Sequence, residues 1–247
     1  MGNLGWLYRA VDGDPAHIVD FLRWLAGHRG LADPVRVLDV GAGVGRMVGP
    51  LSALGWRVTA TEPDPEYRHL LEAAAAHVGA TVTPEAFNDL AHDHEFTLAI
   101  AVNSAFAHVL TPADRADAFQ KLHAALEPGG VLLLDLPNFP WILRNYRAPE
   151  EVVTQADGKQ VRLLHHHTVD FHEATFTTDQ EYTIAEPDRR EEKAWKRHVY
   201  AMTTLPDLLH LMRGAGFGEF EVHASYASRR AERLDGRRMI VTARRIG

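Results

Sequence analysis

The stretch that decides the fold is VLDVGAGVGR, residues 37–46. It opens with an apolar run typical of a buried strand and continues with Gly41, Gly43 and Gly45 before helical periodicity starts. Glycines between a strand and a helix let the backbone approach a ligand closely, and the helix N-terminus offers unpaired N–H groups. The segment therefore predicts a loop that binds a nucleotide-like cofactor.

The same rhythm continues along the chain. Short apolar runs alternate with amphipathic stretches, which predicts a parallel sheet covered by helices on both faces, an α/β fold. Asp64 and Thr111 precede prolines and are expected to cap helices, and Pro128-Gly129-Gly130 is expected to end the helix before the fifth strand. Strands are expected at 35–40, 57–61, 80–83, 97–102 and 131–136, and helices at 14–29, 46–54, 65–77 and 112–126.

The pattern changes after residue 136. Residues 152–202 lack helical periodicity and alternate polar with apolar side chains, and Asp157-Gly158 has the composition of a hairpin turn. A helix resumes after Thr204, and two last strands are expected at 219–226 and 238–244. We therefore predict one domain, with a core at 1–136 and 203–247 and an inserted antiparallel layer on the substrate side at 137–202.

Composition narrows the function classes. The 247 residues are 46% hydrophobic and 24% charged, as in ordinary globular proteins. A net charge of -7 without basic blocks argues against a nucleic-acid partner, and the lack of cysteine excludes disulfides and thiolate metal sites. No apolar run nears the roughly 20 residues of a membrane helix, and no secretory signal pattern is present. We expect a cytoplasmic monomer or homodimer without membrane contact.

The spacing around the glycines distinguishes two cofactor classes. Arg46 stands where the dinucleotide fingerprint requires a small residue, and Asp39 precedes the loop by two positions. Strand, acidic residue and GxGxG together resemble motif I of the class I S-adenosylmethionine-dependent methyltransferases. The resemblance implies a doubly wound, Rossmann-like sheet of seven strands. It also implies S-adenosyl-L-methionine as cofactor and S-adenosyl-L-homocysteine as product.

Glu62 ends the second expected strand, 62 − 41 = 21 positions after Gly41. An acidic residue at about this distance can accept hydrogen bonds from ribose hydroxyls, and the alternative is a solvated strand end. In the resembled family the next position, here Pro63, packs on adenine. Further along, Phe87, Asn88 and Asp89 stand where the family contacts adenine. Their register is open, each could instead be a turn residue, and Asn88 is favoured.

The fourth strand runs into AVNSAFAHVL, residues 101–110, at the carboxyl edge of the sheet where ligands of open α/β folds bind. This stretch and the following helix and strand resemble the small-molecule branch of the family, including glycine and deoxysugar N-methyltransferases. The resemblance covers residues 41–138. The cofactor contacts that the motifs imply, besides Glu62, Pro63 and the 87–89 candidates, are Asp39, Gly41, Ala42, Gly43, Gly45, Arg46, Val102, Asn103 and Ser104.

Two residues are candidates for a catalytic role, and each has a plainer alternative. His108 can act as a base or serve as a capping or packing group. Tyr8 corresponds to an early tyrosine that, in relatives, helps to fold a lid over the sulfonium, or it belongs to the anchoring face of the N-terminal segment. The sequence leaves both pairs of alternatives open.

His165, His166 and His167 invite a metal interpretation, but adjacent strand residues point to opposite faces and cannot converge on one ion. We therefore predict no metal, and expect His165 and His167 to line an acceptor pocket. Ordinary packing of a small sheet explains the neighbouring aromatic residues equally well. The further candidates for that pocket are Phe106, Trp141, Arg144 and Tyr182, and then Phe171, Trp195, His198 and Tyr200.

The resemblance thus implies transfer of a methyl group to nitrogen or oxygen of a small molecule by in-line displacement, with alignment as the protein's main contribution. The first alternative is a nicotinamide-dependent oxidoreductase, which the GxGxG spacing and Arg46 disfavour. The second is a non-catalytic protein that binds the same cofactor.

Overall fold

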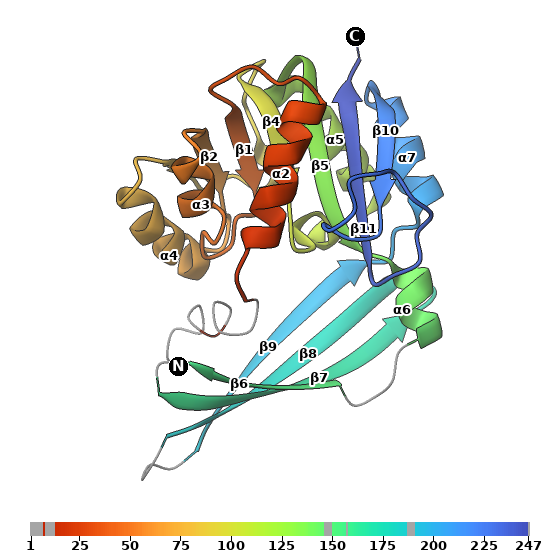
Figure 1. The fold of residues 1–247 in the computed structure, drawn as a ribbon. Coiled ribbons are helices and arrows are strands. Elements are labelled where there is room, and N and C mark those ends of the chain that lie inside the picture. Colours follow the sequence, from red (N-terminus) through yellow and green to blue (C-terminus); the bar gives the residue numbers. More distant parts are fainter. Residues whose placement is uncertain (1–6, 8–12, 146–149, 157, 187–190, 247) are drawn as a thin grey trace.

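The computed structural model describes residue 7 and residues 13–145, 150–156, 158–186 and 191–246. Its core is a seven-stranded sheet with the order β10-β11-β5-β4-β1-β2-β3 (Figure 1). Strands β1 to β5 are parallel, whereas β11 runs antiparallel to both β5 and β10. The strands are β1 (Arg36–Val40), β2 (Arg57–Thr61), β3 (Thr81–Thr83), β4 (Phe96–Ala101), β5 (Leu126–Pro137), β10 (Phe217–His223) and β11 (Arg238–Arg245).

Helices cover both faces of this sheet because the central strands are apolar on both sides. In β5, Leu132 and Leu134 pack into one core cluster with helices α5 and α7, whereas Leu133 packs into a second cluster with α2 and α3. Burial on both faces explains why the strands read as continuous apolar runs. The helices are α2 (Ala16–His28), α3 (Val48–Ala53), α4 (Pro65–Ala76), η1 (Phe87–Asp89), η2 (Ala105–His108), α5 (Pro112–Ala125), α6 (Phe139–Asn145) and α7 (Leu205–Gly214).

The helix starts follow from capping chemistry. The side chains of Asp64, Thr111 and Thr204 accept backbone N–H groups at the starts of α4, α5 and α7, each of which has a proline in its first turn. These predicted starts are confirmed.

The expected role of Pro128-Gly129-Gly130 is wrong, although α5 ends within one residue of its predicted bound. The helix stops at Ala125, and Leu126 already pairs with Phe96 on β4. Pro128-Gly129-Gly130 therefore forms an irregularity inside β5, where Gly129 adopts a φ of +80°.

A second, four-stranded sheet follows β5 and α6 in the chain. Its strands β6 (Glu150–Ala156), β7 (Lys159–Asp170), β8 (Thr175–Ala185) and β9 (Glu192–Ala201) pair antiparallel in sequence order. Ala156 pairs with Lys159 and Gly158 has a φ of +74°, as a tight hairpin turn requires. The predicted α/β fold with an inserted antiparallel layer is confirmed.

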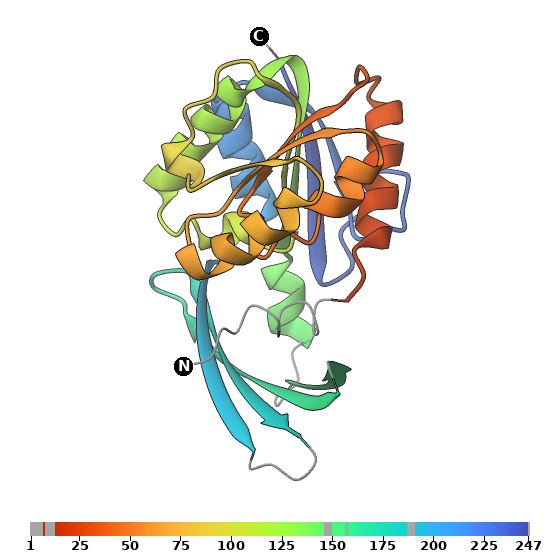
Figure 2. The same cartoon turned by 90° about the vertical axis from the view of Figure 1, so that its left-hand side faces the viewer.

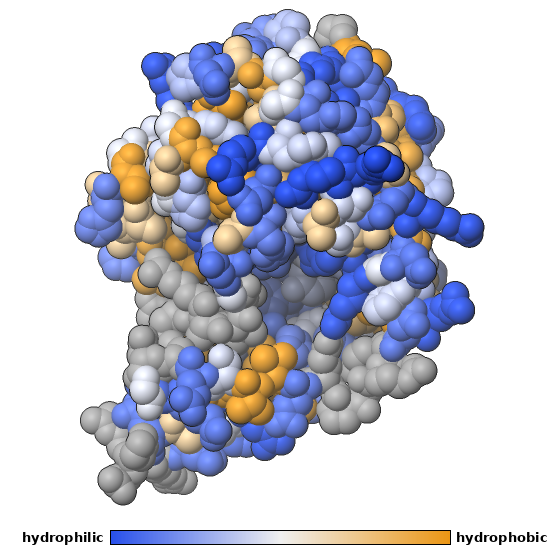
Figure 3. All heavy atoms as spheres, in the orientation of Figure 1, coloured by the Kyte–Doolittle hydropathy of each residue, from blue (hydrophilic) through white to orange (hydrophobic). Residues whose placement is uncertain are grey.

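The small sheet lies at the carboxyl edge of the parallel strands, which both ribbon views show (Figures 1 and 2). It has its own small core, in which Leu7 from the N-terminal segment packs with Val161, Leu163, Tyr182 and Ile184. The molecular surface is hollowed between the two parts (Figure 3). Among the described residues, no helix combines the length and the apolar character needed to cross a membrane.

Candidate active site between the two sheets

A cavity of about 760 Å³ opens between the carboxyl edge of the large sheet and the inner face of the small one. One half is formed by the glycine loop, the segment after β2, η1 and the end of β4. The other half is formed by η2, α6, the start of β11 and strands β7, β8 and β9. Residues more than 150 positions apart therefore share one space, as expected for a ligand site at the end of an open α/β sheet.

The glycine loop forms the floor of the first half. Gly41, Gly43 and Gly45 have φ angles of +72°, +58° and +81°, which L-residues rarely adopt. A Cβ on Gly41 would lie 2.8 Å from the Cβ of Ala105, and one on Gly45 would lie 2.8 Å from Leu71 Cδ1. A Cβ on Gly43 would meet no atom within 4 Å, and Gly43 lines the cavity. Gly41 and Gly45 thus serve packing, whereas Gly43 offers its bare backbone to a ligand.

Glu62 ties this loop to the end of β2. Its buried carboxylate accepts the N–H of Gly43 at 2.8 Å through Oε2 and the N–H of Asp64 at 2.9 Å through Oε1. Burial raises the pKa of Glu62, and these two hydrogen bonds oppose the rise. A carboxylate has about four acceptor positions, so two stay available for hydroxyl donors in the cavity.

Asp39 lies beneath the loop at the end of β1. Its side chain is 1% exposed, and among the described residues neither carboxylate oxygen has a hydrogen-bond partner. Burial raises the pKa of Asp39 to about 7, with a contribution from Glu62, while Arg46 opposes the rise. A buried acid without partners is costly. A cationic group bound beside it would supply the missing interaction.

The other cofactor candidates divide into two groups. Phe87 is in ring contact with Phe106 at 5.2 Å between centroids. Besides Gly41, Gly43, Glu62 and Phe87, the cavity is lined by the candidates Ala42, Arg46, Pro63, Val102, Asn103 and Ser104.

Asp39, Gly45, Asn88 and Asp89 are outside the lining. Asn88, the favoured residue of its group, turns away because its amide donates to the carbonyl of Asp114 and to the carboxylate of Asp117 on α5, both at 2.8 Å. Asp89 accepts the N–H of Ala86 at 3.4 Å.

Strand alternation divides the histidine triplet as expected. His165 and His167 line the cavity, and the Nδ1 atom of His167 lies 2.9 Å from the hydroxyl of Thr178. His166 faces the other side, where it stacks on Trp195. Among the described residues, no group of three or more His, Asp or Glu side chains is arranged to hold a metal ion.

Several acceptor-side candidates lie elsewhere. Phe106 is buried in the main core and Tyr182 in the small core with Leu7, because both side chains point into packed layers. Trp141 and Arg144 lie on α6 outside the lining, since Phe139 and Ile142 occupy the cavity face of that helix. The exposed fractions of Phe171 and Trp195 are 77% and 59%. Tyr8 lies outside the described residues.

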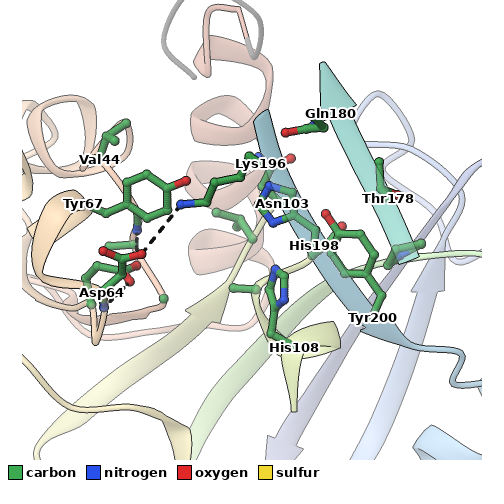
Figure 4. A pocket seen from close by; sticks show the side chains of 18 of the residues that line it. Val44, Asp64, Tyr67, Asn103, His108, Thr178, Gln180, Lys196, His198 and Tyr200 are labelled. Atoms are coloured by element: carbon green, nitrogen blue, oxygen red, sulfur yellow. Dashed lines mark hydrogen bonds and ion pairs between the residues drawn. The ribbon is translucent and has the colours of Figure 1, made fainter. Parts of the chain in front are cut away.

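His108 is fixed by the small sheet. Its Nδ1 atom lies 3.0 Å from the carbonyl oxygen of Val199, which can only accept, so Nδ1 carries the proton and Nε2 keeps a lone pair. The ring centroids of Tyr200 and His198 lie 4.8 and 5.6 Å away (Figure 4). Burial lowers the pKa of His108, and it lowers the pKa of His198 to about 4 with contributions from His108 and Lys196. Both imidazoles are therefore neutral near pH 7.

Sequence reasoning missed part of this wall. Lys196, Thr178 and Gln180 line the cavity beside the histidines, and Tyr67 lines it from α4. The period of two along β9 could have placed Lys196 on the face of His198 and Tyr200. No comparable signal marks Tyr67, which lies on a helix with many exposed residues.

Residues 37–130 match the family model described as a methyltransferase domain. Over these residues the chain is a methyltransferase domain. The match covers the parallel strands β1 to β4 and the glycine loop, and the seven-stranded sheet has the class I methyltransferase topology. The predicted methyltransferase family is confirmed. No curated protein matches the chain.

Solved structures of methyltransferases share the whole fold. An S-adenosylmethionine-dependent methyltransferase from Clostridium acetobutylicum has 13% identity and a TM-score of 0.81, with 99% of this chain and 98% of that chain covered. The sugar N-methyltransferase KedS8 from Streptoalloteichus has 19% identity, a TM-score of 0.78 and coverages of 98% and 92%. The amino pentose methyltransferase CalS10 from Micromonospora echinaspora has 18% identity, a TM-score of 0.75 and coverages of 94% and 91%. At such identities the likeness establishes the fold.

Proposed function

We propose that the protein is an S-adenosylmethionine-dependent N-methyltransferase that acts on the neutral amino group of a small, hydroxyl-bearing molecule. The observation that carries the proposal is the neutral imidazole of His108, which Val199 holds with a free lone pair on Nε2 in a cavity beside the glycine loop. The proposal includes the division of the chain into a cofactor-binding core and the substrate-side layer at 137–202.

Several residues of the cofactor half fit S-adenosylmethionine. Gly43 supplies a bare backbone, Glu62 has acceptor positions for ribose hydroxyls, and Phe87 offers an apolar ring for adenine. The carboxylate of Asp39 lies outside the cavity lining, so it would favour the ammonium of the methionine portion through its charge and not by direct contact. The methyltransferase family match favours this cofactor over a nicotinamide. When bound, S-adenosylmethionine supplies an electrophilic methyl group on sulfur and becomes S-adenosylhomocysteine.

The acceptor half favours a small ligand whose amino group is neutral. The cavity volume lies within the range of small-molecule sites, about 300 to 1,000 Å³. Among the described lining residues, the only carboxylates are Glu62 and Asp64, both in the cofactor half. The acceptor half offers neutral imidazole, hydroxyl and amide groups beside the rings of Phe139 and Phe176, and its charged lining residues are the cations Lys196, Arg237 and Arg238. An amine held there has no carboxylate to stabilise its ammonium form, so it binds in the nucleophilic, neutral state.

The names of two similar structures support an amine on a sugar-like molecule, since one is a sugar N-methyltransferase and the other an amino pentose methyltransferase. Groups such as Thr178 and Gln180 can pair with hydroxyls of an acceptor of this class. The residues of the chain then have three tasks: the walls exclude water, the polar groups orient the amine, and Nε2 of His108 takes the proton that the nitrogen loses as it becomes methylated.

Substitution of His108 tests this role. We expect His108→Gln to keep its affinity for S-adenosylhomocysteine but to lower kcat for an amino sugar by about 100-fold, the typical contribution of a general base. His166→Gln is the matched control, because His166 lies on the outer face of the small sheet, away from the cavity. The measurements are calorimetry with S-adenosylhomocysteine and NADH, and turnover on amino sugars and their hydroxyl analogues. Binding of NADH alone, or methylation of the hydroxyl analogues alone, would overturn the proposed function.

A further inference from the structure

Strand β9 carries the groups that surround His108. Lys196, His198 and Tyr200 follow one another at every second position and all line the cavity, and the carbonyl of Val199 between them holds His108 Nδ1. In the sheet order β6-β7-β8-β9 this strand is an edge, so only β8 pairs with it within its own sheet. Its position over the cofactor half therefore depends on side chains.

Lys196 makes that connection. Its Nζ lies 3.7 Å from Oδ2 of Asp64 and 4.0 Å from the centroid of the Tyr67 ring (Figure 4). The Lys196 side chain is only 22% exposed, which strengthens a cation–π contact by removing water. Asp64 caps α4 and Tyr67 lies in its first turn, two and five positions after Glu62. Lys196 thus connects the edge strand β9 to the segment that follows Glu62, the residue proposed to accept the ribose hydroxyls.

We propose that Lys196 is a positioning residue that couples cofactor binding to the orientation of His108. The contact with Asp64 and Tyr67 fixes β9, and β9 fixes His108 through the Val199 carbonyl and the adjacent Tyr200 ring. A cofactor that fixes the conformation of residues 62–67 therefore also fixes the conformation of the acceptor wall. Because such coupling is reciprocal, a fixed acceptor wall raises the affinity for the cofactor. The functional meaning of this coupling rests on the proposed methyl transfer, whereas the coupling itself is a property of the chain.

The first test needs no turnover. In protein labelled with ¹⁵N-histidine, the spectrum of His108, assigned by its loss in His108→Gln, should show the tautomer protonated at Nδ1. Lys196→Met should shift it to a mixture of tautomers, and Lys196→Arg should restore it. Lys193→Met is the matched control, because Lys193 lies on the same strand but pairs with Glu181 at 2.7 Å on the outer face. An unchanged His108 tautomer in Lys196→Met would overturn the proposal.

The second test measures the coupling. Lys196→Met should weaken S-adenosylhomocysteine binding by about tenfold, the scale of a partly buried cation–π contact with a weak ion pair. It should also raise KM for the acceptor more than it lowers kcat. Tyr67→Leu should act similarly, and the double variant should be little worse than either single one. Additive losses would refute a shared contact. A wild-type protein with the expected tautomer but no methylation would refute the proposed function and leave the coupling standing.

Discussion

The core and the small sheet build their halves of the cavity by different means. In the core, the cavity is formed mainly by the backbone, namely by the glycine φ angles, the strand ends and the N–H groups bound to Glu62. In the small sheet, side chains at alternate positions of β7, β8 and β9 form the cavity wall, and the backbone forms a regular antiparallel sheet behind them. Apart from Lys196, which contacts Asp64 and Tyr67, side chains of the small sheet can therefore change and alter the acceptor without disturbing the cofactor loop, whereas most changes in the loop affect both.

The largest expected effect is in the core, at Gly45. Gly45→Val should destabilise the protein by about 4 kcal/mol, since it combines a strained positive φ with overlap on Leu71. Gly43→Val has the same kind of strain but open space around its Cβ, so it should cost about 1 to 2 kcal/mol of stability and abolish cofactor binding. Urea unfolding and calorimetry on both variants measure the two quantities.

Two results would contradict these expectations for Gly43 and Gly45. If Gly43→Val is folded and binds S-adenosylhomocysteine with native affinity, the loop does not approach the cofactor at that position. If Gly45→Val is as stable as the native protein, α4 is not packed against the loop through Leu71.

The second prediction concerns Asp39, whose charge the ligand-free core does not compensate. The folded pKa of about 7 exceeds the ordinary value of 3.8, so the folded state holds the proton more tightly, and this carboxyl's contribution to stability falls as pH rises between those values. Asp39→Asn removes that loss. We expect the ligand-free variant to be more stable than the native protein at pH 8 by about 2 kcal/mol, and by less at pH 5.

Thermal melts at the two pH values, with and without S-adenosylhomocysteine, check the sign. The ligand should stabilise the native protein more than Asp39→Asn, because only the native side chain can carry a negative charge that attracts the ligand's ammonium. The contrary outcome is a stability difference, Asp39→Asn minus native, that is smaller at pH 8 than at pH 5. It would show that Asp39 already has a partner in the ligand-free state.

The core could be predicted from the sequence because its determinants are local. A strand, three glycines and a helix follow one another within residues 36–53, and caps such as Asp64 act within three residues. The role of Pro128-Gly129-Gly130 was misassigned because Gly129 and Gly130 serve a strand irregularity as readily as a helix stop, and only the pairing of Leu126 with β4 decides between them.

The site was harder to predict because several positions depend on contacts between distant segments. Asn88 is directed by α5, and Tyr182 is buried by Leu7, which lies 175 positions earlier, since 182 − 7 = 175. The position of Lys196 depends on the contact between β9 and the start of α4, which the sequence does not reveal. Alternation did correctly separate His165 and His167 from His166, because the period of a strand is a local property.

The smallest expected effect tests that alternation on the small sheet. Arg197 follows Lys196 but points outward, where its guanidinium pairs with Asp179 at 2.6 and 3.0 Å on an exposed surface. Exposed pairs contribute little because water screens them, so Arg197→Ala should shift the melting temperature by about 2 °C or less and leave acceptor kinetics unchanged. The adjacent His198→Ala should instead raise KM for the acceptor, since His198 lines the cavity. Similar kinetic effects of Arg197→Ala and His198→Ala would mean that the inner face of β9 is not the acceptor wall. The contrast between a core site formed by the backbone and a small-sheet site formed by side chains would then fail as well.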